Sequence, residues 1–360
     1  MKVAKVRFLR VISLFTTMIL SSACSSQQVT EVKQTKEVLQ NIAVEREKTI
    51  ILKNIHTIQG IYPLDWFDEE YILIKKENIN KPEIDKGDST KGYPNNLYKY
   101  NIKTGKEELL VASTRDIGYA VLSPDRRYVY YQEDADVTAT GYIYDIENNK
   151  NIRVTDMEEI PAGIGRWVDN KIIFYSAAKG AVFTADVAGS RKQIIPANGM
   201  FMRDPIKVSD NVYFVSSEYK LYKYDITANK LTNLLSNAAE FVPNKDGSKF
   251  AFVPLGRKSL DIRDAKGNKI MNIYDQGSVG GFSWSKNGKR LAYVVMPQES
   301  NKELLFITHV DTGKTIQFPL DLPQSFPNIL WNPSENKLLM TGYEIVDNIN
   351  KPFAVIIELE

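Results

Sequence analysis

The sequence predicts an all-β protein, a seven-bladed β-propeller of four-stranded antiparallel blades. Three observations predict this fold class. A strand-turn-strand segment recurs seven times, a second strand-turn segment follows six of the seven copies, and successive copies lie about 35 to 56 residues apart. The chain has 360 residues, of which 43% are hydrophobic and 25% charged, so it can bury a large core.

The first recurring segment is clearest in FSWSKNGKRLAYVV, residues 282–295. Its Asn287-Gly288 turn is followed by a β-branched and aromatic run, which is the pattern of a β-hairpin. Weaker copies lie at 64–74, 120–131, 165–175, 206–215, 241–253 and 329–340. Aligning the copies places all four tryptophans of the chain in one column, which consists of Trp66, Leu122, Trp167, Val208, Pro243, Trp284 and Trp331. We expect this column to be a core position that repeats from blade to blade.

The second recurring segment is a strand that ends in Asp or Asn, followed by a turn and a lysine, as in LYKYDITANK at 221–230. A further short apolar strand comes after each copy, so each unit contains four strands. One aspartate recurs in five of the units. We expect these aspartates to cap the turns through hydrogen bonds from backbone N–H groups to the carboxylate; they are Asp145, Asp186, Asp225, Asp264 and Asp311.

The two ends of the repeat region predict how the ring closes. The seventh unit ends at residues 352–360 without a fourth strand, while an unmatched strand, KTIILKNI at 48–55, precedes the first unit. Pairing the two would complete the last blade and remove an exposed sheet edge. Six or eight blades remain alternatives, because the first interval of 56 residues contains a polar loop at 76–96. Short regular strands alone also allow a β-sandwich or two smaller β-domains.

The first residues have the pattern of an export signal. Four basic and no acidic residues precede Cys24, and a mostly apolar run at 8–20 is followed by Ser21, Ser22 and Ala23. The apolar run is shorter than the about 20 residues that a membrane-spanning helix needs. We therefore predict a signal peptide at 1–23, and an N-terminus with a flexible tether at 24–47, ahead of a propeller domain at 48–360.

Cys24 is the only cysteine, so it cannot form an internal disulfide. The stretch Ser21-Ser22-Ala23-Cys24 resembles the lipobox of bacterial lipoproteins, although Ser21 stands where that motif has an aliphatic residue and Leu20 lies one place further out. The resemblance implies that the thiol carries a diacylglycerol, with acyl chains such as palmitate that hold the protein on a lipid bilayer. The alternative is an ordinary cleaved signal peptide with a cysteine that has no such role.

The WSKNGKRLAYV copy at 284–294 and the DTGK turn at 311–314 resemble the repeats of TolB-type and WD40-like propellers. With the lipobox, the chain is also similar to the YqgU-like propeller lipoproteins of Gram-positive bacteria. These resemblances cover about residues 48–360 and imply a fold and a location on the extracytoplasmic face of the cell membrane. They imply no catalytic activity.

The residue content argues against several chemistries. Removing Lys2, Lys5, Arg7 and Arg10 with the signal peptide leaves 42 basic against 44 acidic side chains (46 minus 4 against 44), so nothing favours nucleic acid as a partner. The only histidines, His56 and His309, cannot form a histidine-rich metal site, and we expect no metal, no cofactor and no catalytic residue. The sequence has no G-x-S-x-G nucleophile elbow, Walker A loop or dinucleotide fingerprint.

The remaining candidates lie just before each strand of the tryptophan column, where propeller loops gather at one mouth of the channel. Aromatic and arginine side chains are enriched at binding hot spots. We predict these ligand-binding residues there: Tyr62, Tyr119, Arg166, Phe201, Arg203, Phe241 and Phe326. They predict a non-enzymatic binding or scaffold lipoprotein that recognises a protein, peptide or envelope polymer. Two alternatives are an envelope-glycan lyase or hydrolase, which requires carboxylates beside a tyrosine or arginine at the mouth, and an assembly factor for envelope complexes, which the TolB resemblance implies.

Overall fold

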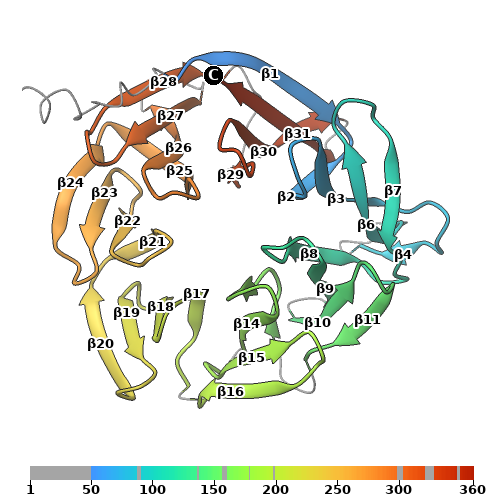
Figure 1. Cartoon of the computed structure of the whole chain (residues 1–360), viewed down its shortest axis with the longest axis horizontal. Coiled ribbons are helices and arrows are strands. Elements are labelled where there is room, and N and C mark those ends of the chain that lie inside the picture. Colours follow the sequence, from blue (N-terminus) through green and yellow to red (C-terminus); the bar gives the residue numbers. More distant parts are fainter. Residues whose placement is uncertain are drawn as a thin grey trace, which may run out of the picture. The chain divides into compact units, whose positions relative to one another are not determined.

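The computed structural model describes residues 50–86, 91–135, 138–155, 160–177, 179–197, 199–297, 303–320, 328–346 and 349–360. Ile50–Glu360 forms one compact unit of seven four-stranded antiparallel sheets, arranged as blades around a channel (Figure 1). The predicted seven-bladed propeller is therefore confirmed. The predicted signal peptide, Cys24 and the tether lie outside the described residues.

In each of the first six blades the four strands follow one another along the chain from the channel outwards, with a small hairpin inserted in blade 1. Blade 1 contains β2 (Tyr62–Trp66), β3 (Tyr71–Glu77), β6 (Asn95–Asn101) and β7 (Glu107–Val111); blade 2 contains β8 (Ile117–Leu122), β9 (Tyr128–Ala135), β10 (Thr138–Asp145) and β11 (Lys150–Arg153); blade 3 contains β13 (Arg166–Trp167), β14 (Ile172–Ser176), β15 (Val182–Asp186) and β16 (Arg191–Ile195). Blade 4 contains β17 (Met202–Val208), β18 (Asn211–Ser216), β19 (Leu221–Asp225) and β20 (Lys230–Leu235); blade 5 contains β21 (Ala238–Pro243), β22 (Lys249–Pro254), β23 (Leu260–Asp264) and β24 (Lys269–Tyr274); blade 6 contains β25 (Gly277–Trp284), β26 (Arg290–Pro297), β27 (Leu304–His309) and β28 (Thr315–Pro319).

Three short strands lie outside this scheme. β4 (Ile84–Asp85) pairs with β5 (Lys91–Gly92) in a small hairpin, which occupies the polar loop that lengthens blade 1. β12 (Ile160–Pro161) pairs with β10 beside blade 2. The long first interval between repeats therefore results from an insertion and not from an additional blade.

Blade 7 joins the two ends of the unit. It contains β29 (Leu330–Trp331), β30 (Lys337–Val346), β31 (Ile349–Leu359) and, as its outermost strand, β1 (Leu52–Gln59). β1 pairs antiparallel with β31 from Leu52 opposite Leu359 to Gln59 opposite Phe353. Closure by the N-terminal strand is confirmed, but the strand lies four residues further along the chain than predicted.

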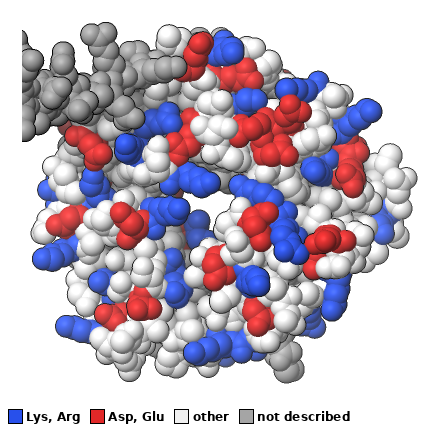
Figure 2. Space-filling view, viewed as in Figure 1, with Lys and Arg blue, Asp and Glu red and all other residues white. Residues whose placement is uncertain are grey.

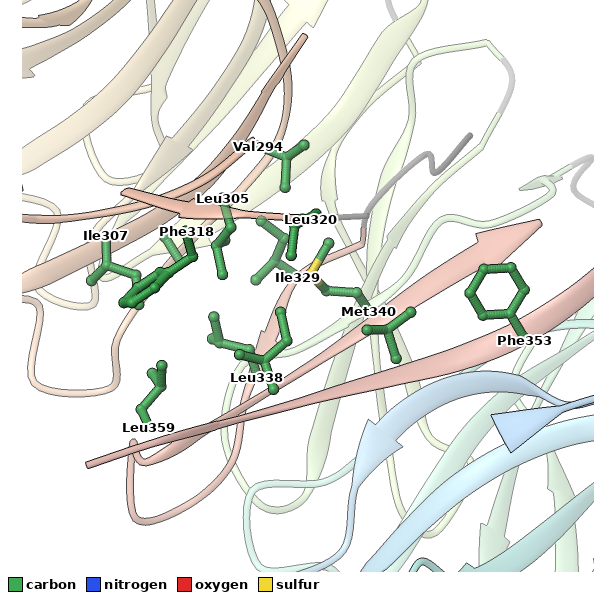
Figure 3. Close-up of a cluster of buried hydrophobic side chains, with 13 residues drawn as sticks. Val294, Leu305, Ile307, Phe318, Leu320, Ile329, Leu338, Met340, Phe353 and Leu359 are labelled. Carbon is green, nitrogen blue, oxygen red and sulfur yellow. The ribbon is translucent and has the colours of Figure 1, made fainter. Parts of the chain in front are cut away.

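The core is the stack of neighbouring sheets. The second and third strands of each blade are the most buried, because both of their faces lie against adjacent blades, whereas the outermost strands are largely exposed. Figure 3 shows one such interface, where Val294, Leu305 and Ile307 of blade 6 face Leu338 and Met340 of blade 7. Each interface buries a continuous apolar layer and thereby holds two blades together.

The tryptophan column repeats one contact at four blade interfaces. Each indole Nε1–H donates to a backbone carbonyl on the innermost strand of the preceding blade, with distances of 2.9–3.1 Å. The acceptor is always the residue just before the column position, and the pairs are Trp66 with Leu330, Trp167 with Val121, Trp284 with Val242, and Trp331 with Ser283. The column is therefore a packing position between blades, as predicted.

The aspartate-capped turns are confirmed at four of the five predicted positions. Asp145, Asp186, Asp225 and Asp264 each accept backbone N–H groups of their own turn. The prediction for Asp311 is wrong, because His309 pairs with the first residue of β26 and so takes the capping position. The His309 ring contacts the Thr312 hydroxyl at 3.2 Å, and Asp311, two residues on, pairs with Lys249 of blade 5 at 2.7 Å.

The strand directions define two faces. The connections from one blade to the next and the connections between the second and third strands lie on one face, which we call the mouth face. The turns between the first and second strands and between the third and fourth lie on the opposite face, which we call the turn face. Ile51 at the start of the unit exchanges backbone hydrogen bonds with Glu360, and therefore lies on the turn face.

Candidate functional site

The innermost strands surround the central opening, and Figure 2 shows basic and acidic side chains around it. Each innermost strand of blades 1, 2, 4, 5 and 6 contains a β-bulge, where its register with the second strand shifts. A bulge redirects a side chain out of the regular alternation. The bulges in blades 4 and 5 lie beside the charged residues of the candidate site, Asp204 and Glu240.

Arg166 of blade 3 and Asp204 of blade 4 form the central ion pair of the mouth. One guanidinium nitrogen lies 2.6 and 2.8 Å from the two carboxylate oxygens, and Nε lies 3.2 Å from one of them. Both side chains are 46% exposed. Burial disfavours the charged form of Arg166, but the nearby Asp204 and Tyr119 outweigh it and raise the pKa of the guanidinium. The pair is preformed and accessible to a ligand.

Glu240 of blade 5 extends the charged region to the next blade. Its carboxylate lies 3.0 Å from the guanidinium of Arg257, which also donates to the Val279 carbonyl of blade 6 at 3.2 Å. Burial raises the pKa of Glu240, Arg257 lowers it, and Asp204 and Arg166 act on it with opposite signs. The two ion pairs are therefore electrostatically coupled across blades 3 to 5.

Tyr119 of blade 2 borders the same region. Its hydroxyl donates to the Gly165 carbonyl at 2.8 Å, and its ring meets Tyr130 edge-on at a centroid distance of 6.4 Å. Burial raises the pKa of Tyr119 to about 12, Arg166 lowers it, and Asp204 raises it further. Tyr119 therefore positions the backbone next to Arg166 and stays protonated at neutral pH.

An apolar and cationic area adjoins the ion pairs. Phe201 and Leu255 are 38% and 48% exposed, and the exposed Arg203 lies over the Tyr219 ring at 5.1 Å. Backbone hydrogen bonds connect this area, because Ala238 N–H donates to the Tyr219 carbonyl at 2.7 Å and Leu255 N–H donates to the Asn237 carbonyl at 2.8 Å. We call the combined surface the mouth patch; it consists of Arg166, Phe201, Arg203, Asp204, Tyr219, Glu240, Leu255, Arg257 and Lys258.

Tyr62 lies in a different cluster, between blades 7, 1 and 2. Its ring lies 4.5 Å from the Lys75 ammonium and meets Tyr343 edge-on at 6.1 Å. Lys75 donates to the Gly118 carbonyl at 2.7 Å, and burial lowers its pKa while Asp116 raises it. These groups satisfy one another, so Tyr62 belongs to the packing around Lys75 and not to the mouth patch.

The structure places the other predicted site residues as follows. Arg166, Phe201 and Arg203 lie in the mouth patch, with Tyr119 at its border. Phe241 is buried between blades 4 and 5, where its ring lies 6.4 Å from that of Tyr213, so its prediction as a ligand contact is corrected. The bulge between Ala238 and Glu240 explains this placement, since Glu240 takes the accessible position and Phe241 turns into the core. Phe326 lies outside the described residues.

Sequence reasoning missed Asp204, Glu240 and Arg257. Arg257 follows β22 closely, which gave a weak signal, whereas Asp204 and Glu240 lie at bulges within β17 and β21, and no pattern in the sequence indicates which residue of a bulge faces solvent. Within the described ranges no group of three or more His, Cys, Asp and Glu side chains could hold a metal ion. The described strands and loops also contain no helix that is long and apolar enough to cross a membrane.

Fold and site together define a closed seven-bladed β-propeller with a charged channel mouth. No family model matches the sequence, and no curated protein matches it. Among solved structures, the chain is similar to a WD40 propeller of the mitotic checkpoint complex, with 13% identity and a TM-score of 0.59 over 96% of this chain and 99% of that one.

The chain is also similar to TolB from Acinetobacter baumannii, with 17% identity and a TM-score of 0.46 over 63% of this chain. This chain spans 60% of the length of that TolB chain. At 13% identity the similarity to the mitotic checkpoint propeller concerns the fold alone, and it agrees with the propeller predicted from the repeats.

Proposed function

We propose that this chain is a lipid-anchored binding or scaffold protein on the extracytoplasmic face of the cell membrane, which recognises a protein, peptide or envelope polymer with its mouth face. The observation that carries the proposal is the mouth patch. In it, the accessible Arg166–Asp204 pair, the Glu240–Arg257 pair and the exposed Phe201 come together from three consecutive blades. Arginine and aromatic side chains at the centre of a surface are typical of binding hot spots.

The backbone of the patch supports a binding role. Asp204, Tyr219 and Arg257 have positive φ angles of 44°, 58° and 54°, which residues other than glycine seldom adopt. Such conformations cost about 1–3 kcal/mol each and tend to occur at functional sites. Here they orient two charged side chains and the ring under Arg203, so the recognition surface is formed before a ligand arrives.

The N-terminal sequence supports the proposed location. The basic and apolar segment before Cys24 has the pattern of an export signal, and the lipobox-like residues supply an acylation site. Ile51, at the start of the described propeller, lies on the turn face, opposite the mouth patch.

A crosslinking experiment in intact cells tests the binding role. We would replace Phe201 with a photo-reactive phenylalanine analogue, irradiate the cells and identify adducts by mass spectrometry. The matched control carries the analogue at Val168, an exposed residue on the turn face. We expect one stoichiometric partner from position 201 and none from position 168. Equal adducts from both positions, or none, would contradict a binding role for the mouth.

Cys24→Ala tests the anchor. Without the thiol no thioether to diacylglycerol can form, so we expect the protein to be released from the membrane or to remain unprocessed. Membrane fractionation and the mass of the mature N-terminus measure this outcome. Normal processing with unchanged membrane retention would refute lipid anchoring.

One observation favours a second candidate, an enzyme that acts on an envelope glycan. This alternative requires carboxylates beside a tyrosine or arginine at the mouth, and Asp204, Glu240, Tyr119 and Arg166 meet that description. Glu240, whose pKa is raised by burial, would serve as the general acid. Turnover of cell-wall fragments by the purified protein, abolished in Glu240→Gln, would establish this activity in place of the scaffold role.

A further inference from the structure

We infer that the mouth patch recognises an acidic polypeptide segment that also carries apolar side chains. The inference rests on the proposed binding function and specifies the chemistry of its partner. Two features of the described residues carry it, an excess of positive charge in the patch and exposed aliphatic and aromatic side chains among those charges.

The carboxylates of the patch are already engaged. Asp204 is paired with Arg166 at 2.6 Å, and Glu240 is paired with Arg257 at 3.0 Å. The four cations of the patch therefore outnumber its two carboxylates, and a ligand cation would have to displace an arginine from its partner.

The surplus cations are Arg203 and Lys258. Both are exposed, and neither has a carboxylate partner among the described residues. The guanidinium of Arg203 lies over the Tyr219 ring at 5.1 Å, a cation–π contact that holds the guanidinium without neutralising its charge. A planar guanidinium that is held in place but unpaired is well suited to a carboxylate, which it binds through two parallel hydrogen bonds.

The apolar residues distinguish a polypeptide from a simple polyanion. Phe201 lies two residues before Arg203, and Leu255 lies three residues before Lys258, so each surplus cation has an exposed apolar residue close to it along the chain. Bringing apolar ligand groups against these side chains contributes about 25 cal/mol per Å² of apolar surface removed from water. A phosphate polymer has no such groups, whereas a peptide that combines Glu or Asp with Leu or Phe has both.

Backbone hydrogen bonds connect the blade 4 part of the patch, around Arg203 and Tyr219, with the blade 5 part, around Leu255 and Lys258. Tyr219, which lies under Arg203, accepts a hydrogen bond from the N–H of Ala238, and Asn237 next to it accepts one from the N–H of Leu255. Val279 of blade 6 in turn donates its N–H to the Arg257 carbonyl at 2.8 Å. These backbone hydrogen bonds connect blades 4, 5 and 6, so the patch, whose residues lie on blades 3 to 5, forms a continuous surface that an extended segment can cross.

Fluorescence anisotropy with the purified full chain in detergent micelles tests the inference. The probes are labelled peptides of alternating Glu and Leu, Glu and Ser, or Lys and Leu, together with inorganic polyphosphate. We expect the Glu-Leu peptide to bind about tenfold or more tightly than either other peptide, because only it offers both chemistries. Arg203→Ala combined with Lys258→Ala should weaken this binding by a similar factor, whereas Lys286→Ala, an exposed cation on the turn face, should leave it unchanged.

Each other outcome overturns the inference. If the Lys-Leu peptide bound as tightly as the Glu-Leu peptide, charge would have no role in recognition. If the Glu-Ser peptide bound as tightly, Phe201 and Leu255 would have none. Binding of polyphosphate without the Glu-Leu peptide would assign the patch to a polyanion. If the peptides fail while the crosslink from position 201 still identifies a partner, only the inference is lost; if the crosslink fails as well, the proposed function is lost with it.

Discussion

The interface between blades 7 and 1 and the interface between blades 3 and 4 are built from opposite chemistry. At the first, the fully buried Trp66 donates to the Leu330 carbonyl at 3.1 Å. At the second, the column residue is Val208, and the polar contact is the half-exposed Arg166–Asp204 pair. Both positions lie beside the channel and derive from the same repeat. The difference between them therefore reflects the separate contributions of the two interfaces to stability and to ligand recognition.

The comparison shows which blade interfaces stabilise the fold and which leave side chains accessible to a ligand. The indoles at four interfaces, of which Trp66 is fully buried and the other three are partly buried, give apolar contact and a satisfied hydrogen bond, both of which stabilise the ring. Blades 2, 4 and 5 lack the tryptophan, and two of them, blades 4 and 5, carry most of the mouth patch. An exposed ion pair contributes little to folding, about 0.2–1 kcal/mol, but it stays available to a ligand. Blades 4 and 5, which lack the tryptophan, therefore supply most of the recognition surface, while the tryptophan interfaces hold the ring closed.

Trp66→Ala should have the largest effect. Removing a fully buried indole leaves a cavity at the closing interface, and such changes cost about 3–5 kcal/mol of the free energy of unfolding. Urea unfolding followed by circular dichroism would measure the loss. Val208→Ala at the equivalent position of blade 4 is the control, and we expect it to cost less than half as much because its side chain is only partly buried. Equal losses of unfolding free energy in the two variants would show that the two interfaces contribute equally to stability.

Glu69→Gln should have the next largest effect. The Glu69 carboxylate of blade 1 accepts the Ser334 N–H of blade 7 at 3.1 Å and contacts the Asn332 amide, so it ties the ends of the ring together. Hydrogen bonds to a charged acceptor contribute about 1.5–3 kcal/mol, and the amide would keep only part of that. Thermal unfolding measures the change. The control is Glu147→Gln, which affects an exposed pair with Arg127 and should change stability by less than about 0.5 kcal/mol.

The sequence was sufficient for the architecture because propeller folding repeats one short pattern. The tryptophan column and the hairpin turns appear in every blade, so weak signals reinforce one another and the blade count follows. Closure by the N-terminal strand was predictable because the last repeat lacked a strand. The capping residue of blade 6 was not predictable. The DTGK segment matches the spacing of the other turns, but the strand pairing places His309, and not Asp311, at the capping position.

The site was predictable only in part. Arg166, Phe201 and Arg203 were identified because arginine and aromatic residues before a column strand are few. Glu240 was missed and Phe241 was chosen in its place, because a one-residue bulge exchanges their orientation. A bulge depends on pairing between strands and leaves no reliable trace in the local sequence, so the accessible side of an innermost strand becomes known only from the structure.

Tyr119→Phe tests a residue at the edge of the mouth patch whose hydroxyl group contributes to packing. We expect a loss of about 1 kcal/mol at neutral pH, because the Gly165 carbonyl loses its donor. Burial raises the pKa of Tyr119 to about 12, above the value of about 10 in the unfolded chain, so the tyrosine stabilises the fold below pH 10 and loses that contribution as the pH rises from 10 to 12. The deficit of the variant should therefore shrink across this interval in urea titrations. A constant deficit would contradict a buried, protonated Tyr119.

Asp204→Asn should have the smallest effect on stability and so provides the sharpest contrast with Trp66→Ala. The pair with Arg166 is half exposed, and pairs of this kind contribute about 0.2–1 kcal/mol. Asparagine also tolerates the positive φ of 44° at this position, so the backbone should be retained. We expect near-normal urea unfolding together with altered recognition, because Arg166 is freed and the patch gains positive charge, which should strengthen binding of the Glu-Leu peptide. A large loss of stability would mean that the interface between blades 3 and 4 is held by this pair, and the division between structural and recognition interfaces would then fail.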